Sequence, residues 1–460
     1  VLQWVDAVRY LRVDPRGFFA DPWSPAGYPA FLAIVRFITP VLSVTTAAQD
    51  VLGLIGGVFV YLTVRRIATP PWLGMIPAAI PLLSGDYLFL EHILMSETLF
   101  MTLTFAALYA AVRSRNAAHP RLWLGVAGIV MAASALVRPL TLVLPIVIAS
   151  WAVWVHGGTA RARVTAALSC LGPAGVVIGL YMAVALSIGP YAGIGDMSGW
   201  DLYARAAPFA QCSAFTPPPG TRGLCQAVPP AQRPGPFYYD WEATSPGRRL
   251  FPHTPAGARM VGRWARAAIL AEPGAYLKAV VKDLARYVDP SIGAVREYSG
   301  IPYALYQFSY RSPAEERLIG RAIETRGYTD VLPVNASGMT ELEDYQTIFH
   351  IDGLPILAFV ALAIMGLWLC RGLLREGIAL LTASAFLLYL LPTLTLSYDV
   401  RYGWPPAPVL AAAGVLSAYG MVLRYLDRPP GGSLGRGAPV ENGKPVHRRW
   451  SRGRWGRSRT

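Results

Sequence analysis

The feature that most restricts the fold of this chain is a series of long apolar runs separated by short basic segments. A membrane-spanning helix needs about 20 mostly apolar residues. The runs cover residues 44–62, 72–83, 93–112, 122–137, 140–155, 166–188, 354–370, 378–396 and 408–423. Only 15% of the 460 residues are charged, whereas soluble domains carry about 25%. The sequence therefore predicts an all-α polytopic membrane protein with about nine transmembrane helices.

The basic segments indicate how the chain is oriented. Lys and Arg concentrate in the short cytoplasmic loops of membrane proteins. Here they follow the runs that end at residues 62, 112, 155 and 370, so they fall on one side throughout. If that side is cytoplasmic, the chain starts outside and ends inside, and we expect a further helix before Val1. The expected organisation is a first extracytoplasmic loop with short amphipathic helices (1–43), transmembrane helices (44–189), a mixed extracytoplasmic domain (190–349), transmembrane helices (350–425) and a disordered basic cytoplasmic tail (426–460).

The net charge of +14 does not point to a nucleic-acid partner, because of where the charge lies. The tail alone holds nine Lys and Arg against two acids, and much of the remaining excess lies in the basic loops. Attraction of the tail to anionic lipid is one expectation, and a topology signal is the other. In the outer segment, Cys212 and Cys225 are expected to form a disulfide if they face an oxidising compartment. Its amphipathic stretches 258–270 and 276–287 fit either the membrane interface or the domain's own core.

Charged side chains near a membrane core are costly and tend to mark function. Here they gather at the outer ends of the runs, which favours an outward-facing polar cavity over a pore. Glu97 lies about one turn inside its apolar run and needs a partner, either Arg138 or a substrate. Arg138 precedes a proline and is expected at a tight outer turn, or as a snorkelling arginine. His92 and Glu97 are five residues apart, so a metal site with His350 has little support. We assign no metal ligand, and a divalent metal stays open.

Nucleotide-binding motifs of the GxGxxG and Walker types do not occur in the sequence, and the GxSxG match at residues 431–435 lies in the Gly/Pro/Arg-rich tail, without the strand and helix that a nucleophile elbow needs. Four other stretches form a pattern. They are residues 6–10 (Asp-Ala-Val-Arg-Tyr), 24–32 (Ser-Pro-Ala-Gly-Tyr-Pro-Ala-Phe-Leu), 95–100 (Met-Ser-Glu-Thr-Leu-Phe) and 400–408 (Val-Arg-Tyr-Gly-Trp-Pro-Pro-Ala-Pro), with a weaker fifth at 135–139 (Ala-Leu-Val-Arg-Pro). Through these stretches and their order along the sequence, the chain resembles the GT-C superfamily of membrane glycosyltransferases. The nearest relatives in that resemblance are bacterial homologues of protein O-mannosyltransferases and of the aminoarabinose transferase of lipid A.

The resemblance implies an inverting glycosyltransferase of the plasma membrane with an extracytoplasmic active site and a role in cell-wall biogenesis. Its donor would be a sugar on polyprenyl phosphate, and its acceptor a glycan, a glycolipid or a protein. Asp6 would be the general base, and Arg138 and Arg401 would hold the leaving phosphate. The remaining candidates for the site are Glu97, Tyr10 and Tyr402, followed by His92, His350, Asp21 and Asp399. The family often has a second acid after the first one, where this chain has Ala7.

Two other classes of function remain open at this point. A transporter or flippase of lipid-linked sugars would share the lipid groove and the outer arginines. A non-catalytic membrane assembly subunit would keep the fold alone. The sequence does not identify the sugar or the acceptor.

Overall fold

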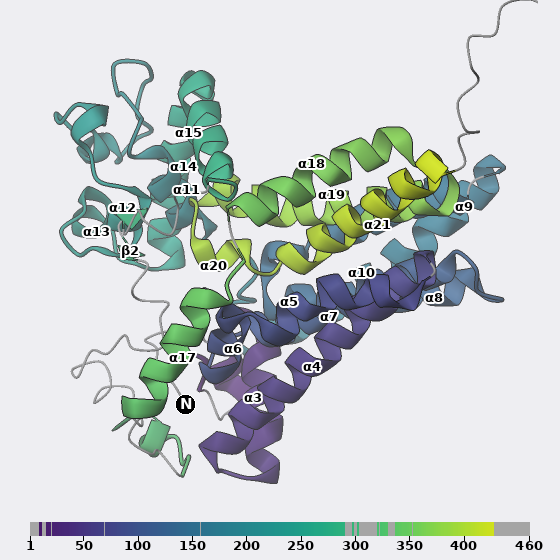
Figure 1. Cartoon of the computed structure of the whole chain (residues 1–460). Helices are drawn as coiled ribbons and strands as arrows, with labels where there is room; N and C mark the ends of the chain where they lie inside the picture. Colours follow the sequence, from purple (N-terminus) through teal and green to yellow (C-terminus); the bar gives the residue numbers. More distant parts are fainter. Residues whose placement is uncertain are drawn as a thin grey trace, which may run out of the picture. The chain divides into compact units, whose positions relative to one another are not determined.

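The computed structural model describes residues 9–11, 15–19, 21–68, 70–156, 158–289, 297–298, 301–302, 320–321, 323–329, 336–351 and 353–426. Asp6 and the basic tail beyond residue 426 lie outside the described residues. Helices dominate the described part (Figure 1). The N-terminal half contains α2 (Pro15–Phe18), α3 (Gly27–Ile38), α4 (Leu42–Ile67), η1 (Pro71–Gly74), α5 (Met75–Leu83), α6 (Gly85–His92), α7 (Glu97–Ser114), α8 (Pro120–Val137), η2 (Pro139–Thr141), α9 (Leu144–His156) and α10 (Ala160–Ile188).

The outer segment and the C-terminal helices complete the described chain. They comprise α11 (Ser198–Ala206), η3 (Arg222–Leu224), η4 (Pro230–Gln232), α12 (Pro236–Trp241), α13 (Pro246–Leu250), α14 (Pro255–Ala271), α15 (Pro273–Arg286), β1 (Glu297–Tyr298), β2 (Ile301–Pro302), α17 (Ala336–Ile348), α18 (Leu354–Leu369), α19 (Gly372–Thr395), α20 (Val400–Gly403) and α21 (Ala407–Leu426). The two strands pair as one short antiparallel hairpin.

Six helices in the described part of the chain are long and apolar enough to cross a membrane. A seventh span results if the bent pair Pro71–Leu83 and Gly85–His92 counts as one. The expected count of nine is therefore not confirmed. α18 has 16 residues, which extend over about 24 Å of a bilayer core of about 30 Å. α7 starts on a carboxylate and ends in a basic turn with Arg113.

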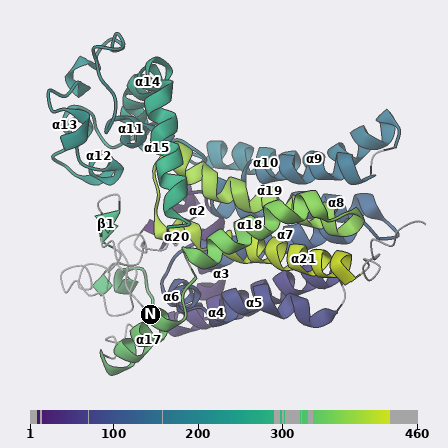
Figure 2. The same ribbon diagram turned by 45° about the horizontal axis from the view of Figure 1, so that its top comes forward.

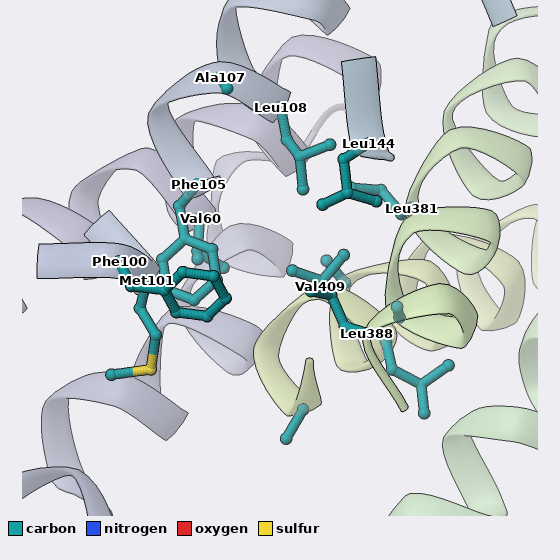
Figure 3. Packing of buried hydrophobic residues seen from close by; sticks show 14 of the residues in the cluster. Val60, Phe100, Met101, Phe105, Ala107, Leu108, Leu144, Leu381, Leu388 and Val409 are labelled. Atoms are coloured by element: carbon teal, nitrogen blue, oxygen red, sulfur yellow. The ribbon is translucent and has the colours of Figure 1, made fainter. Parts of the chain in front are cut away.

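The membrane helices pack around one apolar core. Figure 3 shows Val60 of α4, Phe105 of α7, Leu144 of α9, Leu388 of α19 and Val409 of α21 converging in it. All five side chains are less than one-tenth exposed. The outward faces of the same helices carry exposed leucines and valines, as expected where the solvent is lipid.

The two ends of α19 contact different parts of the chain, a basic loop at its start and helix α11 at its end. Near its start, Glu376 pairs with Arg115, which follows α7, at 2.7 Å. Near its end, the carbonyl of Thr393 accepts a hydrogen bond of 2.8 Å from Arg205 of α11. The 17 residues between Glu376 and Thr393 rise by about 26 Å, so these contacts lie at opposite ends of the helix. Both views place α11–α15 beside the end of α19 (Figure 1, Figure 2).

Helices α11–α15 have a small core of their own. Trp200, Tyr203 and Trp264 are fully buried in it, and a disulfide joins Cys212 to Cys225. α14 turns its apolar face into this core, which is the second of the two alternatives that the sequence left open. The expected mixed structure is helical in its described residues, except for the short hairpin.

Candidate functional site

Glu97 is the first residue of α7, preceded by the non-helical residues 93–96. The sequence placed it one turn inside a helix starting near residue 93, and that expectation was wrong. A carboxylate is favoured at a helix N-terminus, where the helix dipole presents positive charge. The side chain is only 1% exposed.

Arg138 lies at the turn between α8 and η2. It ends α8 with an extended backbone (φ −142°, ψ 122°), and Pro139 opens the following turn. This is the tight turn predicted from the residue order Arg-Pro. Its guanidinium Nη1 pairs with Glu97 Oε1.

Arg401 reaches the same carboxylate from α20. Its Nε lies 3.4 Å from Glu97 Oε1, and its Nη1 lies 3.6 Å from the sulfur of Met95. Asp399 caps α20 by accepting a hydrogen bond of 3.0 Å from the backbone N–H of Arg401. Tyr402 lies beside both arginines, with its ring centroid 5.3 Å from the Arg401 guanidinium and 5.5 Å from that of Arg138.

Glu97, Arg138 and Arg401 thus form one ion triad, drawn from three separate parts of the chain. Two guanidinium groups share a single carboxylate oxygen of Glu97. Paired guanidinium groups of this kind are suited to an anion, because the planar guanidinium matches the oxygens of a phosphate.

The Gly-Tyr-Pro stretch fastens the first loop against the helix that carries Arg138. A Cβ on Gly27 would lie 2.4 Å from the backbone oxygen of Leu136, so only glycine allows this approach of α3 to α8. The Tyr28 hydroxyl donates to Gln49 Oε1 at 2.5 Å. Tyr10 packs edge-on against Tyr28 at 4.9 Å and interacts electrostatically with Arg138. Tyr10 and Tyr402 therefore both belong to the arginine site.

The other candidates have local roles in the structure. Asp21 accepts hydrogen bonds from the Trp23 backbone at 3.1 Å and from the Ser24 hydroxyl at 2.9 Å, which closes a turn. His92 donates to the carbonyl of Leu88 at 2.8 Å, and His350 to that of Thr347 at 3.0 Å. Among the residues that the structure describes, no three His, Cys, Asp or Glu side chains are grouped for a metal ion. The assignment of Asp6 lies outside the described residues and stays a prediction.

An apolar pocket of about 490 Å³ lies between α9 and α19. Its lining runs from Val143 to Trp154 on one side and from Ala379 to Leu387 on the other. Val143, at one end of the lining, is five residues after Arg138 in the sequence, and the pocket follows α9 from there towards Trp154. A rise of about 1.5 Å per residue gives the α9 wall a length of about 17 Å.

Sequence reasoning missed three residues around the arginines. Gln49 binds the backbone carbonyls of Glu91 and Ile93 at 2.6 and 2.8 Å, just before Glu97. A polar residue inside an apolar run was the available signal for it. Tyr28 lies within the Gly-Tyr-Pro stretch of residues 24–32. Asp201 of α11, which interacts electrostatically with Tyr402, had no distinguishing signal.

Comparisons of this chain with protein-family models, with curated proteins and with solved structures found no match.

Proposed function

We propose that this chain is a membrane glycosyltransferase that uses a polyprenyl-phosphate sugar at the outer face of the plasma membrane. The observation that carries the proposal is the position of the ion triad. Arg138 and Arg401 share one carboxylate oxygen of Glu97, and an apolar pocket starts five residues beyond Arg138. A polyprenyl phosphate combines the same two features, an anionic head and a long apolar tail.

The triad would act on the leaving group. When the sugar departs, negative charge develops on the phosphate, and preorganised cations stabilise it most effectively in a water-poor site. Arg138 and Arg401 are held in place by Glu97 and by the faces of Phe100 and Tyr402, so little reorganisation is needed.

The acceptor hydroxyl needs a base. Asp6 is assigned this role from the resemblance of residues 6–10, since a carboxylate within reach of a hydroxyl contributes about 10²–10⁴-fold to proton transfer. Tyr10, four residues later, is part of the arginine site, which supports placing this stretch near the phosphate. Attack from the side opposite the phosphate would invert the anomeric centre.

Transfer from a synthetic polyprenyl-phosphate sugar to a soluble glycan, by the purified chain in lipid nanodiscs, tests the proposal. Asp6→Asn should lower kcat by at least about 100-fold, whereas the matched control Asp344→Asn, at an exposed site on α17, should keep wild-type transfer. Movement of the same lipid between leaflets of proteoliposomes, without transfer, would instead identify a flippase. If the preparation shows neither sugar transfer nor lipid movement, the result supports a non-catalytic assembly subunit.

A further inference from the structure

A second cluster of functional side chains surrounds α12 in the outer segment. The rings of Trp23 and Trp241 stack at a centroid distance of 5.0 Å and an angle of 28°. The ring of His253 packs against both, at 4.9 Å from Trp23 and 5.5 Å from Trp241. Trp200 closes the inner side, 4.8 Å from His253. Trp241 is 39% exposed, so the cluster reaches the surface there.

A buried carboxyl group lies under the rings. Asp240 Oδ1 is 3.3 Å from His253 Nε2, and the residue is 0% exposed. Its second oxygen, Oδ2, has no hydrogen-bond partner in the part of the chain that the structure describes. Buried polar atoms are nearly always paired, and one that is unpaired calls for an explanation. A bound water molecule would supply the missing donor.

Burial also sets the charges of this pair. It raises the pKa of Asp240 to about 7, against the opposing effect of Arg248 and Arg9. It lowers the pKa of His253 to about 4. At neutral pH the imidazole is therefore uncharged, with one nitrogen that donates and one that accepts.

Arg9 lies beside the two stacked rings. Its guanidinium is 5.6 Å from the centroid of Trp23 and 5.5 Å from that of Trp241. The two distances are nearly equal, so Arg9 lies beside the stacked pair and not over the outer face of Trp241. Tyr10, the next residue, belongs to the arginine site. The cluster is therefore linked to the phosphate-binding arginines by two adjacent residues.

The chemistry of the cluster selects a class of ligand. Arg9 and Arg248 disfavour a cation beside the rings. An exposed indole face packs well against an apolar C–H surface, and convergent donors and acceptors at its edge fix hydroxyl groups. A neutral ring with an apolar face and a hydroxyl-bearing rim satisfies all of these conditions, and a sugar is such a ring.

We infer that the exposed face of Trp241, with Arg9 and His253 at its edge, binds a sugar ring of the acceptor. This inference rests on the proposed glycosyl transfer and narrows the acceptor to a carbohydrate. Asp240 is a positioning residue, because it holds the tautomer and orientation of His253 from below.

Saturation-transfer NMR on the full chain in nanodiscs tests the subsite, with methyl α-mannopyranoside, methyl α-arabinofuranoside and a linear mannotriose as probes. Wild type should give saturation transfer to the ring C–H protons of at least one probe. Trp241→Ala should weaken its affinity by about tenfold or more. The matched control is Trp368→Ala, at an 83% exposed tryptophan on α18, and it should leave the signal unchanged.

Two results would overturn the subsite. One is the absence of saturation transfer to all three probes in wild type, and the other is an unchanged affinity in Trp241→Ala. Failure of the proposed function looks different. In that case probe binding would still depend on Trp241, while the same preparation would transfer no sugar from a polyprenyl-phosphate donor. Conversely, transfer with an acceptor KM unaffected by Trp241→Ala would remove the subsite and keep the enzyme.

Discussion

The Glu97 carboxylate offsets the repulsion between the guanidinium groups of Arg138 and Arg401 in a largely buried site. With the carboxylate 1% exposed, its interactions with Arg138 and Arg401 are screened much less than those of surface pairs. Removal of one partner from a buried ion cluster leaves charge without compensation, and the cost is typically about 3–5 kcal/mol. Glu97 therefore lowers the free-energy cost of burying Arg138 and Arg401 in the folded chain.

Glu97→Gln keeps the shape of the side chain but removes its charge, so the free energy of unfolding in detergent should fall by about 3 kcal/mol. Glu341→Gln is the control, because Glu341 is exposed on α17, and it should change stability by less than about 0.5 kcal/mol. Equal effects of the two substitutions would show that the triad is not the stabilising contact described here.

Sequence reasoning found the members of the triad but not the whole geometry. Glu97 needed a partner, and Arg138 was one of the two alternatives considered. The start of α7 was misplaced because residues 93–96 are apolar enough to continue a helix, whereas the carbonyls of Glu91, in α6, and of Ile93 are bound by Gln49. That contact spans more than forty residues and leaves no local signature.

At the scale of elements, the segment between α19 and α20 is tied to the outer helices by one carboxylate. Asp283 of α15 accepts two hydrogen bonds of 2.7 Å from Arg205 and one of 3.2 Å from the backbone N–H of Tyr398. Arg401 follows three residues later. Gly403 packs so closely on the ring of Tyr287 that a Cβ would lie 2.9 Å from it. Helices α11 and α15 thus fix the segment that carries Arg401.

Asp283→Ala should loosen that segment. Loss of the anchoring hydrogen bonds should raise amide hydrogen exchange of residues 396–403 by about tenfold, the effect of roughly 1.4 kcal/mol in local opening. Glu272→Ala is the matched control, since it removes an exposed contact to Gln211 of the same group of helices. If both variants exchange like wild type over residues 396–403, Asp283 does not position Arg401.

The elements themselves were well predicted where local chemistry decides. The Arg-Pro turn after α8 and the two amphipathic stretches of the outer segment follow from local rules on proline and on hydrophobic periodicity. The anchoring by Asp283 could not be predicted, because Asp283 and Arg205 are 78 residues apart. In the sequence, each of them is typical of a solvent-exposed charged side chain.

In the whole molecule, α19 is long enough for the arginine site and the basic loops to lie at opposite surfaces of a bilayer. The contacts of Glu376 and Thr393 are separated by about 26 Å along the helix, close to the thickness of a bilayer core. The arginine site and the outer helices share one end, and the basic loops share the other. The sequence predicted this division from the parity of its basic loops. Its count of nine spans is not confirmed, because apolar composition does not reveal where a helix is short or begins on a charge, and six or seven helices of the described residues pass a test of length and composition.

We propose that Arg138 and Arg401 hold the phosphate of a polyprenyl lipid whose tail follows α9 and α19. A cryo-EM structure of the chain in nanodiscs with a bound polyprenyl monophosphate tests this claim most directly. We expect phosphate density between the two guanidinium groups and continuous tail density along the pocket from Val143 towards Trp154. A phosphate bound away from both arginines, or a tail lying between other helices, would contradict the account.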